Sequence, residues 1–376
     1  MEVTILNTKF EPVGVIDTYK SFIWTDRYDE AGDFEIHMPM NDKIPDDIQK
    51  DYYLWNENSE HMMIIESLTI ESDVESGATL IVSGRSLESI LTRRIVWDKR
   101  VFFRKTAEED KPSLQNGIKT LITENVIEPE IEIRKIPNFI FEESTDERIT
   151  SLTFEDQFLG EDLYSIVTKL CKEEEIGFKV TLNDENQFVF KLYKGVDRSY
   201  AQNENPYVVF SPEYENILNS NYLDSYSKWK NVTLVVGEQE LNDDGEEVSR
   251  IQYVQEQGDK VSGLDRREVF TDATGLSQDD GYGGKLSAEA YQAHLRQKGI
   301  DTLIDNTIIT AIEGEIDAST MFVYRTDFFV GDTVQVANEY GNEGCSYVSE
   351  LVITCDESGT SIYPTFKTIQ KGVYET

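Results

Sequence analysis

The chain has few of the residues that carry most enzyme and metal chemistry. Its 376 residues include three cysteines and three histidines. No CxxC pair occurs and the cysteine count is odd, which favours a reducing compartment over a disulfide framework. No HExxH or other paired metal-ligand spacing occurs either. The cysteines are Cys171, Cys345 and Cys355, and the histidines are His37, His61 and His294.

Basic residues are scarce as well. Lys and Arg number 35 against 72 Asp and Glu, which gives a net charge of -37. This balance disfavours partners with polyanionic surfaces, because phosphate binding needs basic patches. It suits either ordinary solubility or a channel through which DNA slides without adhering. The sequence contains no run of 18 apolar residues and no signal-peptide pattern at its start, so we expect no membrane span and assembly in a host cytoplasm.

Catalytic motifs are missing too. Gly284, Lys285 and Ser287 resemble a phosphate loop, but the leading glycine and the adjacent Ser or Thr are absent. Two segments, LNDDGEE and LSQDDGYGG, are similar to calcium loops, yet Ile251 stands where the bidentate Glu should follow Gly245. We therefore expect no catalytic centre and no cofactor, with a weakly binding surface calcium site as the alternative.

The residues that are present predict a folded, β-rich protein. Hydrophobic residues make up 39% of the chain and aromatic residues 11%, which argues against disorder despite the charge. Alternating strand patterns dominate residues 1–100 and 206–376, whereas residues 101–205 combine helical spacing with two strands. The sequence thus predicts an α+β, β-rich fold of three domains with these bounds, and a helical insertion at about 238–305 in the third.

Helical spacing marks a few segments. Residues 86–94 predict a short helix, and residues 113–126 and 161–175 predict longer ones. Cys171 lies on the apolar stripe of the last of these, so we predict a packed thiol rather than a nucleophile. Ser287 is the predicted N-cap of a helix in the insertion.

A hairpin is predicted at residues 20–39. Phe34, Ile36 and Met38 alternate with polar residues, which is typical of a half-buried strand. We expect Gly32 to take a positive φ in the turn and Pro39 to end the strand or confine it to an edge. Arg27 and Tyr28, which enter the turn, form either a ligand clamp or a structural contact in which Arg27 pairs with nearby carboxylates.

Two distant segments share a pattern. LTIESDVESG at 68–77 and LVITCDESG at 351–359 have Leu, Ile and Asp at the same offsets, followed by Glu-Ser-Gly with one gap. A basic residue, Arg85 or Lys367, follows each glycine by eight positions. Both segments therefore predict hairpins of one construction. A true duplication would give two related β-barrel-like domains flanking a different one, and three chains could then form a ring of six; chance similarity is the alternative.

The segment of residues 1–100, the first block of the chain, resembles the N-terminal part of the Gp37-like tail proteins of siphophages. These belong to the wider baseplate-hub group that includes the hub region of tail-associated lysins. The motifs are YKSFIWTDRYDEAGDFEIHMP, MMIIESLTIESD and LIVSGRSLESILTRRIV. The residues that carry the resemblance are Trp24, Arg27, Tyr28, Gly32, Phe34, Glu35, Pro39, Ile64, Ile65, Glu66, Gly84, Arg85, Ser86, Leu87, Leu91, Arg94 and Ile95.

This resemblance implies a structural protein of the virion tail tip. It implies a homotrimer whose paired barrel-like tube domains form a pseudo-hexameric ring, which docks on the hexameric distal tail protein and lets DNA pass through its lumen. Tape measure and tail fibre or receptor-binding proteins are further expected partners. The chain ends at Thr376, soon after the last predicted strand, so we expect a hub without wall-degrading activity. The resemblance leaves calcium dependence open.

We expect outward apolar residues of segments 20–96 and 320–368 to form interfaces, and Arg85 and Arg94 to pair with carboxylates within or between subunits. Two other functions remain open. One is a hydrolase that cleaves cell-wall polymer through a carboxylate pair. The other is a host-saccharide-binding module that uses exposed tryptophans, namely Trp55, Trp97 or Trp229.

Overall fold

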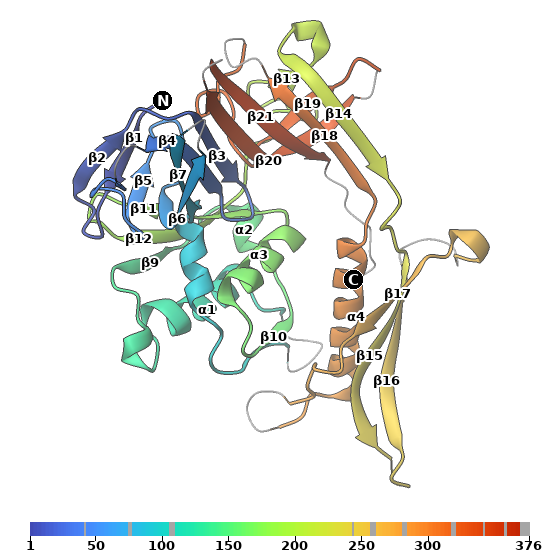
Figure 1. The fold of residues 1–376 in the computed structure, drawn as a ribbon. Helices are drawn as coiled ribbons and strands as arrows, with labels where there is room; N and C mark the ends of the chain where they lie inside the picture. Colours follow the sequence, from blue (N-terminus) through green and yellow to red (C-terminus); the bar gives the residue numbers. More distant parts are fainter. Residues whose placement is uncertain are drawn as a thin grey trace.

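The computed structural model describes residues 1–40, 43–73, 77–104, 110–242, 244–255, 261–279, 284–316, 321–340, 343–356 and 359–368. As the sequence predicts, the fold is β-rich with some helices (Figure 1). No helix in this described part is both long and apolar enough to span a membrane.

One large sheet contains strands from both ends of the chain. Its strands are β1 (Val3–Leu6), β2 (Pro12–Ile16), β3 (Ser21–Arg27), β4 (Asp33–Met40), β5 (Tyr53–Trp55), β6 (Met63–Asp73), β7 (Gly77–Ser86), β13 (Val209–Phe210), β14 (Ile217–Ser225), β18 (Ile309–Ile316), β19 (Thr333–Ala337), β20 (Glu343–Asp356) and β21 (Gly359–Thr368). Their order is β14-β18-β21-β20-β3-β4-β7-β6-β5-β1-β2, and β19 joins β13 to β20. This path is open, and strand pairing closes no barrel among the described residues.

A helical unit covers the middle of the chain, and we call it the middle unit. Its elements are β8 (Arg100–Phe102), α1 (Leu114–Ile122), η2 (Thr123–Ile127), η3 (Glu132–Arg134), β9 (Phe139–Glu142), α2 (Glu147–Thr150), β10 (Asp156–Phe158), α3 (Leu163–Glu173), β11 (Gly177–Leu182) and β12 (Phe188–Tyr193). Both predicted long helices and the β11–β12 hairpin are confirmed. Asp162 caps α3, because its carboxylate accepts a hydrogen bond from the Ser165 N–H at 2.9 Å. The Cys171 thiol is fully buried on the apolar face of α3, as predicted.

The chain between β14 and β18 folds as a separate arm (Figure 1). The arm has its own sheet, ordered β16-β15-β17, and one long helix. The helix begins after Ser287, whose hydroxyl accepts a hydrogen bond from Ala290 N–H, as the sequence predicts. The elements of the arm are β15 (Val232–Leu241), β16 (Glu247–Gln255), η5 (Gly263–Asp265), β17 (Glu268–Asp272) and α4 (Ala288–Asp305), while the 3₁₀ turn η4 (Pro212–Tyr214) lies before β14.

The predicted hairpin at 20–39 is confirmed as the antiparallel pair β3–β4, but several details were wrong. Gly32 does not have a positive φ. Pro39 lies inside β4, beyond the point where β3 stops pairing, and β4 is not an edge strand. Residues 321–332 form turns rather than a strand, and the helix after β7 is the 3₁₀ helix η1 (Leu87–Arg93). Strand β14 was missed.

Candidate assembly site

The two hairpins that share the sequence pattern also share their strand register. Each has three regular pairs, a one-residue β-bulge, and seven further pairs before the turn. The bulge residue is Glu66 in β6 and Ser349 in β20, and each lies two positions before the repeated Leu68 or Leu351. Because a bulge determines how a strand bends and where its side chains point, its identical place shows that the two hairpins have one construction.

The match extends to the neighbouring strands. In the sheet, β4 lies beside β7 and β3 lies beside β4, just as β18 lies beside β21 and β14 lies beside β18. We call β3-β4-β7-β6 the N-terminal unit and β14-β18-β21-β20 the C-terminal unit. Through these pairs Trp24 on β3 corresponds to Tyr222 on β14, and Asp26 corresponds to Asp224. The sequence carries the same signal, WTDRY at 24–28 against YLDSY at 222–226.

β20 and β6 differ in what lies beside them after the bulge. Before it, β20 pairs with β19 and β6 pairs with β5. After it, residues 350–356 of β20 pair with β3 of the N-terminal unit, whereas residues 67–73 of β6 have no second strand among the described residues. β14, the counterpart of β3, is the end strand of the sheet. Among the described strands, this part of β6 and the outer side of β14 are thus open edges of the kind that the chain joins internally.

Side-chain exposure follows this difference. At the β20–β3 junction, Ile353 lies opposite Trp24, and they are 2% and 0% exposed. Their counterparts Ile70 and Tyr222 are 48% and 39% exposed. An open strand edge with apolar side chains is a surface that favours pairing with another chain.

Arg27 links the two units at this junction. Its Nε donates to Glu350 Oε2 at 2.6 Å, and its Nη1 contacts Asp33 Oδ2 at 2.6 Å and donates to the Ala31 carbonyl at 2.9 Å. The expected pairing with a carboxylate of the turn is therefore present, and the bond to Glu350 on β20 is an addition that sequence spacing does not reveal.

Tyr28 packs where both units meet the middle unit. Its ring lies against Gly177 and Gly331, and a Cβ at either glycine would come within 2.4 Å of ring atoms. Its hydroxyl donates to the Glu175 carbonyl at 3.3 Å and accepts from Gly195 N–H at 3.3 Å. Burial raises the pKa of Tyr28 above its ordinary value. Tyr28 is 2% exposed, so its ring is part of the core at this place.

Glycines of the N-terminal unit allow close backbone contact. A Cβ at Gly32 would lie 2.1 Å from the Thr25 carbonyl oxygen, and one at Gly84 would lie 1.8 Å from that of Ile64. Gly32 also donates its N–H to Ser86 Oγ at 2.7 Å. Gly32 is therefore required by lack of space rather than by its φ.

The remaining family-motif residues have separate places. Trp24, Phe34 and Leu87 are buried in cores, and Glu35 contacts His37 at 2.7 Å on the surface. Arg85 forms a two-point pair with Glu66, at 2.8 and 2.9 Å, as expected. Arg94 donates to the carbonyls of Arg134 and Arg93, and the carboxylate pairing expected for it within the chain is absent among the described residues.

A buried polar network underlies the junction, and sequence reasoning missed it. Asp26 accepts hydrogen bonds from Trp24 Nε1 at 3.2 Å, Ser59 Oγ at 2.6 Å and Tyr324 Oη at 2.7 Å. Beside it, His61 Nδ1 lies 3.1 Å from Glu88 Oε1, and both side chains are buried.

Burial alone would lower the pKa of His61, but the charge and hydrogen bond of Glu88 outweigh burial and raise it to about 9.

The other two histidines lie elsewhere. His37 pairs with Glu35, and His294 stacks on Phe103 where the arm meets the middle unit, with ring centroids 3.3 Å apart. The three histidines are thus dispersed. Among the described residues, no group of three or more His, Cys, Asp or Glu side chains could hold a metal; parts of both calcium-like loops, Asp243 and residues 280–283, lie outside them.

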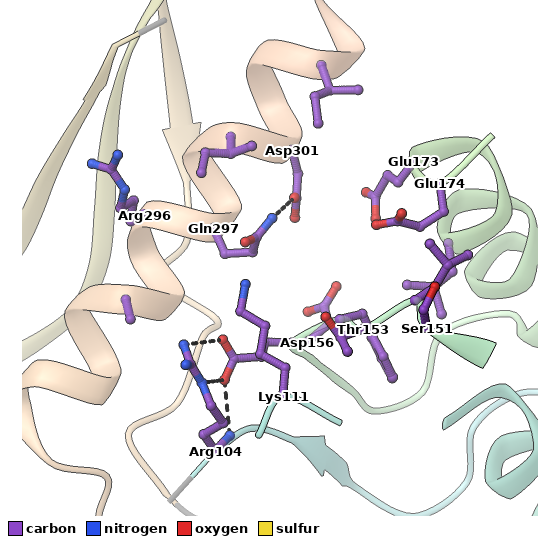
Figure 2. Close-up of a pocket in the computed structure, with 17 residues that line it drawn as sticks. Arg104, Lys111, Ser151, Thr153, Asp156, Glu173, Glu174, Arg296, Gln297 and Asp301 are labelled. Carbon is purple, nitrogen blue, oxygen red and sulfur yellow. Dashed lines mark hydrogen bonds and ion pairs between the residues drawn. The ribbon is translucent and has the colours of Figure 1, made fainter. Parts of the chain in front are cut away.

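A cleft of about 410 Å³ separates the arm from the middle unit. Asp301 on α4 faces Glu173 and Glu174 at the end of α3 (Figure 2). Lys169 Nζ lies 2.7 Å from Asp156 Oδ2, 3.5 Å from Glu173 Oε1 and 4.0 Å from Asp301 Oδ2.

Burial and the charge of Asp301 raise the pKa of Glu173 to about 8. One lysine thus holds several carboxylates together where the arm meets the rest of the chain.

The tryptophans considered for saccharide binding lie on different segments. Trp55 is 47% exposed on β5 and Trp97 is 52% exposed after η1. Arg134 covers the Trp97 ring at 4.9 Å, and Arg267 covers that of Trp229 at 5.1 Å.

This large sheet with a middle unit and an arm is the fold of phage tail proteins. The 43 kDa tail protein of prophage MuSo2 from Shewanella oneidensis superposes with a TM-score of 0.58 at 10% identity, covering 98% of each chain. The tail protein from Neisseria meningitidis MC58 gives 0.55 at 12% identity, covering 99% of this chain and 97% of that one. Prophage tail protein gp18 from Listeria monocytogenes gives 0.51 at 11%, covering 99% and 95%.

The chain belongs to the family described as Siphovirus ReqiPepy6 Gp37-like protein, whose model matches residues 2–366. No curated protein matches the sequence significantly. The expected family resemblance is therefore confirmed, and it extends well beyond the first block of the sequence.

Proposed function

We propose that this protein is a structural hub of the virion tail tip, without catalytic activity, in which copies join edge to edge into a ring. The observation that carries the proposal is the internal β20–β3 junction, together with the open edges of β6 and β14 that correspond to it. If β6 of one copy pairs with β14 of the next as β20 pairs with β3, Ile70 lies opposite Tyr222. Both exposed side chains then become buried.

The number of copies comes from the family resemblance, because the junction defines only the relation between neighbours. Three copies give six similar units and a pseudo-hexameric ring that matches a hexameric distal tail protein. Each copy would comprise two barrel-like tube domains, residues 1–100 and 206–376, around the domain 101–205. The charge of -37 per copy would let DNA pass through the lumen with little adhesion.

A disulfide cross-link tests this register. Ile70→Cys and Tyr222→Cys are combined in a chain where Cys345 and Cys355 are replaced by Ser, and the oxidised protein is examined by non-reducing electrophoresis. We expect linked dimers and trimers, because Cα atoms of opposed residues on neighbouring strands lie about 4.5–5.5 Å apart. The control moves one cysteine to Ser72, two positions along the same face, and should link poorly.

Mass measurement and negative-stain imaging test the ring itself. We expect a trimer mass and ring-shaped particles, alone or with a hexameric distal tail protein. A persistent monomer that forms no ring with that partner would contradict the hub. Clearing of peptidoglycan by the purified protein, abolished by one Asp or Glu substitution, would favour the hydrolase instead.

A further inference from the structure

A second surface has unusual chemistry for so acidic a chain. A groove of about 420 Å³, which we call the arginine groove, lies beside η1 and η3 and is lined by Thr92, Arg93, Arg94, Ile95, Trp97, Ile131, Ile133 and Arg134. Its apolar side chains include Ile133, 92% exposed, and Trp97, 52% exposed. Three arginines, Arg93, Arg94 and Arg134, surround them.

Two of these arginines have no carboxylate within ion-pair distance in the described part of the chain. Arg94 donates from Nε to the Arg134 carbonyl and from Nη1 to the Arg93 carbonyl, both at 2.7 Å. Arg134 donates to the Ile95 carbonyl at 2.9 Å and to Asn125 Oδ1 at 3.1 Å. Only Arg93 has an acid, Asp51 at 3.0 Å.

These hydrogen bonds fix the guanidinium groups without neutralising them. Burial and the charges of Arg134 and Arg93 lower the pKa of Arg94 below its ordinary value, which agrees with a guanidinium that has cations rather than a carboxylate beside it. Acids outnumber bases by 72 to 35 in this chain, so two neighbouring arginines, Arg94 and Arg134, that lack a carboxylate partner need an explanation beyond composition.

We propose that the arginine groove binds a segment of a different protein that presents a carboxylate beside aliphatic or aromatic side chains. Arginine recognises carboxylates in a two-point geometry, and Trp97 and Ile133 are exposed anchors for the apolar part. Strands β6 and β14, which we propose join copies of this chain, contribute no residue to the groove. A long polyanion is disfavoured because the net charge repels it, whereas a short peptide experiences mainly charges within a Debye length of about 8–10 Å.

The probe is a fluorescein-labelled synthetic peptide that alternates Glu and Leu, and its binding to the full chain is measured by fluorescence anisotropy. Ile133→Ala and Arg134→Gln should each weaken binding about tenfold. Ile133 is almost fully exposed, so its truncation leaves the fold intact. The matched controls are Leu264→Ala, 98% exposed, and Arg267→Gln, whose guanidinium covers Trp229 in the same geometry; both should bind like the parent.

Three results would each overturn the proposal. One is the absence of saturable binding of the Glu/Leu peptide. Another is equal binding of a Glu/Gln peptide or of polyphosphate, which would make the groove a general anion site. The third is a change of oligomer mass in Ile133→Ala, which would make it an interface between copies of this chain.

Discussion

The N-terminal and C-terminal units have the same strand order and register but different surroundings. In the N-terminal unit β3 is covered by β20, and a five-residue turn, 28–32, connects β3 to β4. In the C-terminal unit β14 has no second neighbouring strand among the described residues, and a whole arm lies between it and β18. One strand arrangement thus provides a closed internal junction in one place and an open edge in the other. The residues at corresponding positions should therefore differ in whether they affect folding or assembly.

The largest expected contrast is between Trp24 and Tyr222. Trp24→Ala removes a fully buried ring that packs on Phe22 and Phe34, and should lower the free energy of unfolding by about 3–5 kcal/mol. Tyr222→Ala should change it by less than about 0.5 kcal/mol but should dissociate the oligomer. Urea unfolding measures the first effect, and light scattering measures the second.

Phe34→Leu is the matched control for Trp24→Ala, since it keeps an apolar side chain in the same core. Its cost should be clearly smaller. If Tyr222→Ala unfolds the chain as strongly as Trp24→Ala does, β14 is part of the folding core and the assembly edge lies elsewhere.

The next contrast concerns the corresponding aspartates. Asp26→Ala leaves two buried donors, on Trp24 and Ser59, and the half-buried hydroxyl of Tyr324 without their acceptor, and should cost about 2–3 kcal/mol of stability. Asp224 is exposed, so Asp224→Ala should cost clearly less than Asp26→Ala, because interactions in water are weaker than those of a buried carboxylate. Thermal melting of both variants measures the two losses of stability. Equal losses would show that Asp224 contributes as much to folding as Asp26 does.

Sequence patterns predicted local elements well. The β3–β4 hairpin, α3 and the capped helix α4 follow from alternation, apolar spacing and Ser287, which act within a few residues. The family and the β-rich fold could also be predicted, because WTDRY and SGRSL keep their order along the chain.

Contacts between distant segments could not be predicted in this way. Glu350 meets Arg27 because β20 lies beside β3, and Tyr324 reaches Asp26 from a segment that the pattern assigned to a strand. The open edges of β6 and β14 are likewise properties of the whole sheet. The repeated Leu-Ile-Asp pattern indicated two related hairpins but could not show that one edge is covered and its counterpart is open.

The arm of the C-terminal unit gives a pH-dependent prediction. In the folded chain the pKa of Glu173 is raised to about 8, above its ordinary value of 4.5, and that of Asp301 is also raised by burial. The folded state therefore binds more protons, so docking of α4 should weaken as pH rises from about 4.5 to about 8. Hydrogen exchange of α4 at pH 5 and pH 8 measures this change.

Glu173→Gln should flatten that pH dependence, because the amide needs no proton to remain neutral. Glu289→Gln, an exposed change in the first turn of α4, is the control and should leave the pH dependence unchanged. Exchange that is faster at pH 5 than at pH 8, after correction for the intrinsic rate, would contradict the assigned proton uptake.

The smallest contrast compares the turns of the two repeated hairpins. Gly77 has φ 81° and Gly359 has φ 133°, and a Cβ at either position would meet no atom within 4 Å. Substitution by Ala therefore adds only backbone strain, of about 1–3 kcal/mol. Because φ near 133° is less accessible to an L-residue than φ near 81°, Gly359→Ala should lower the urea midpoint more than Gly77→Ala. The opposite order would show that the two turns differ in more than the φ of their glycines. The match between the two hairpins would then not extend from the strands into the turns.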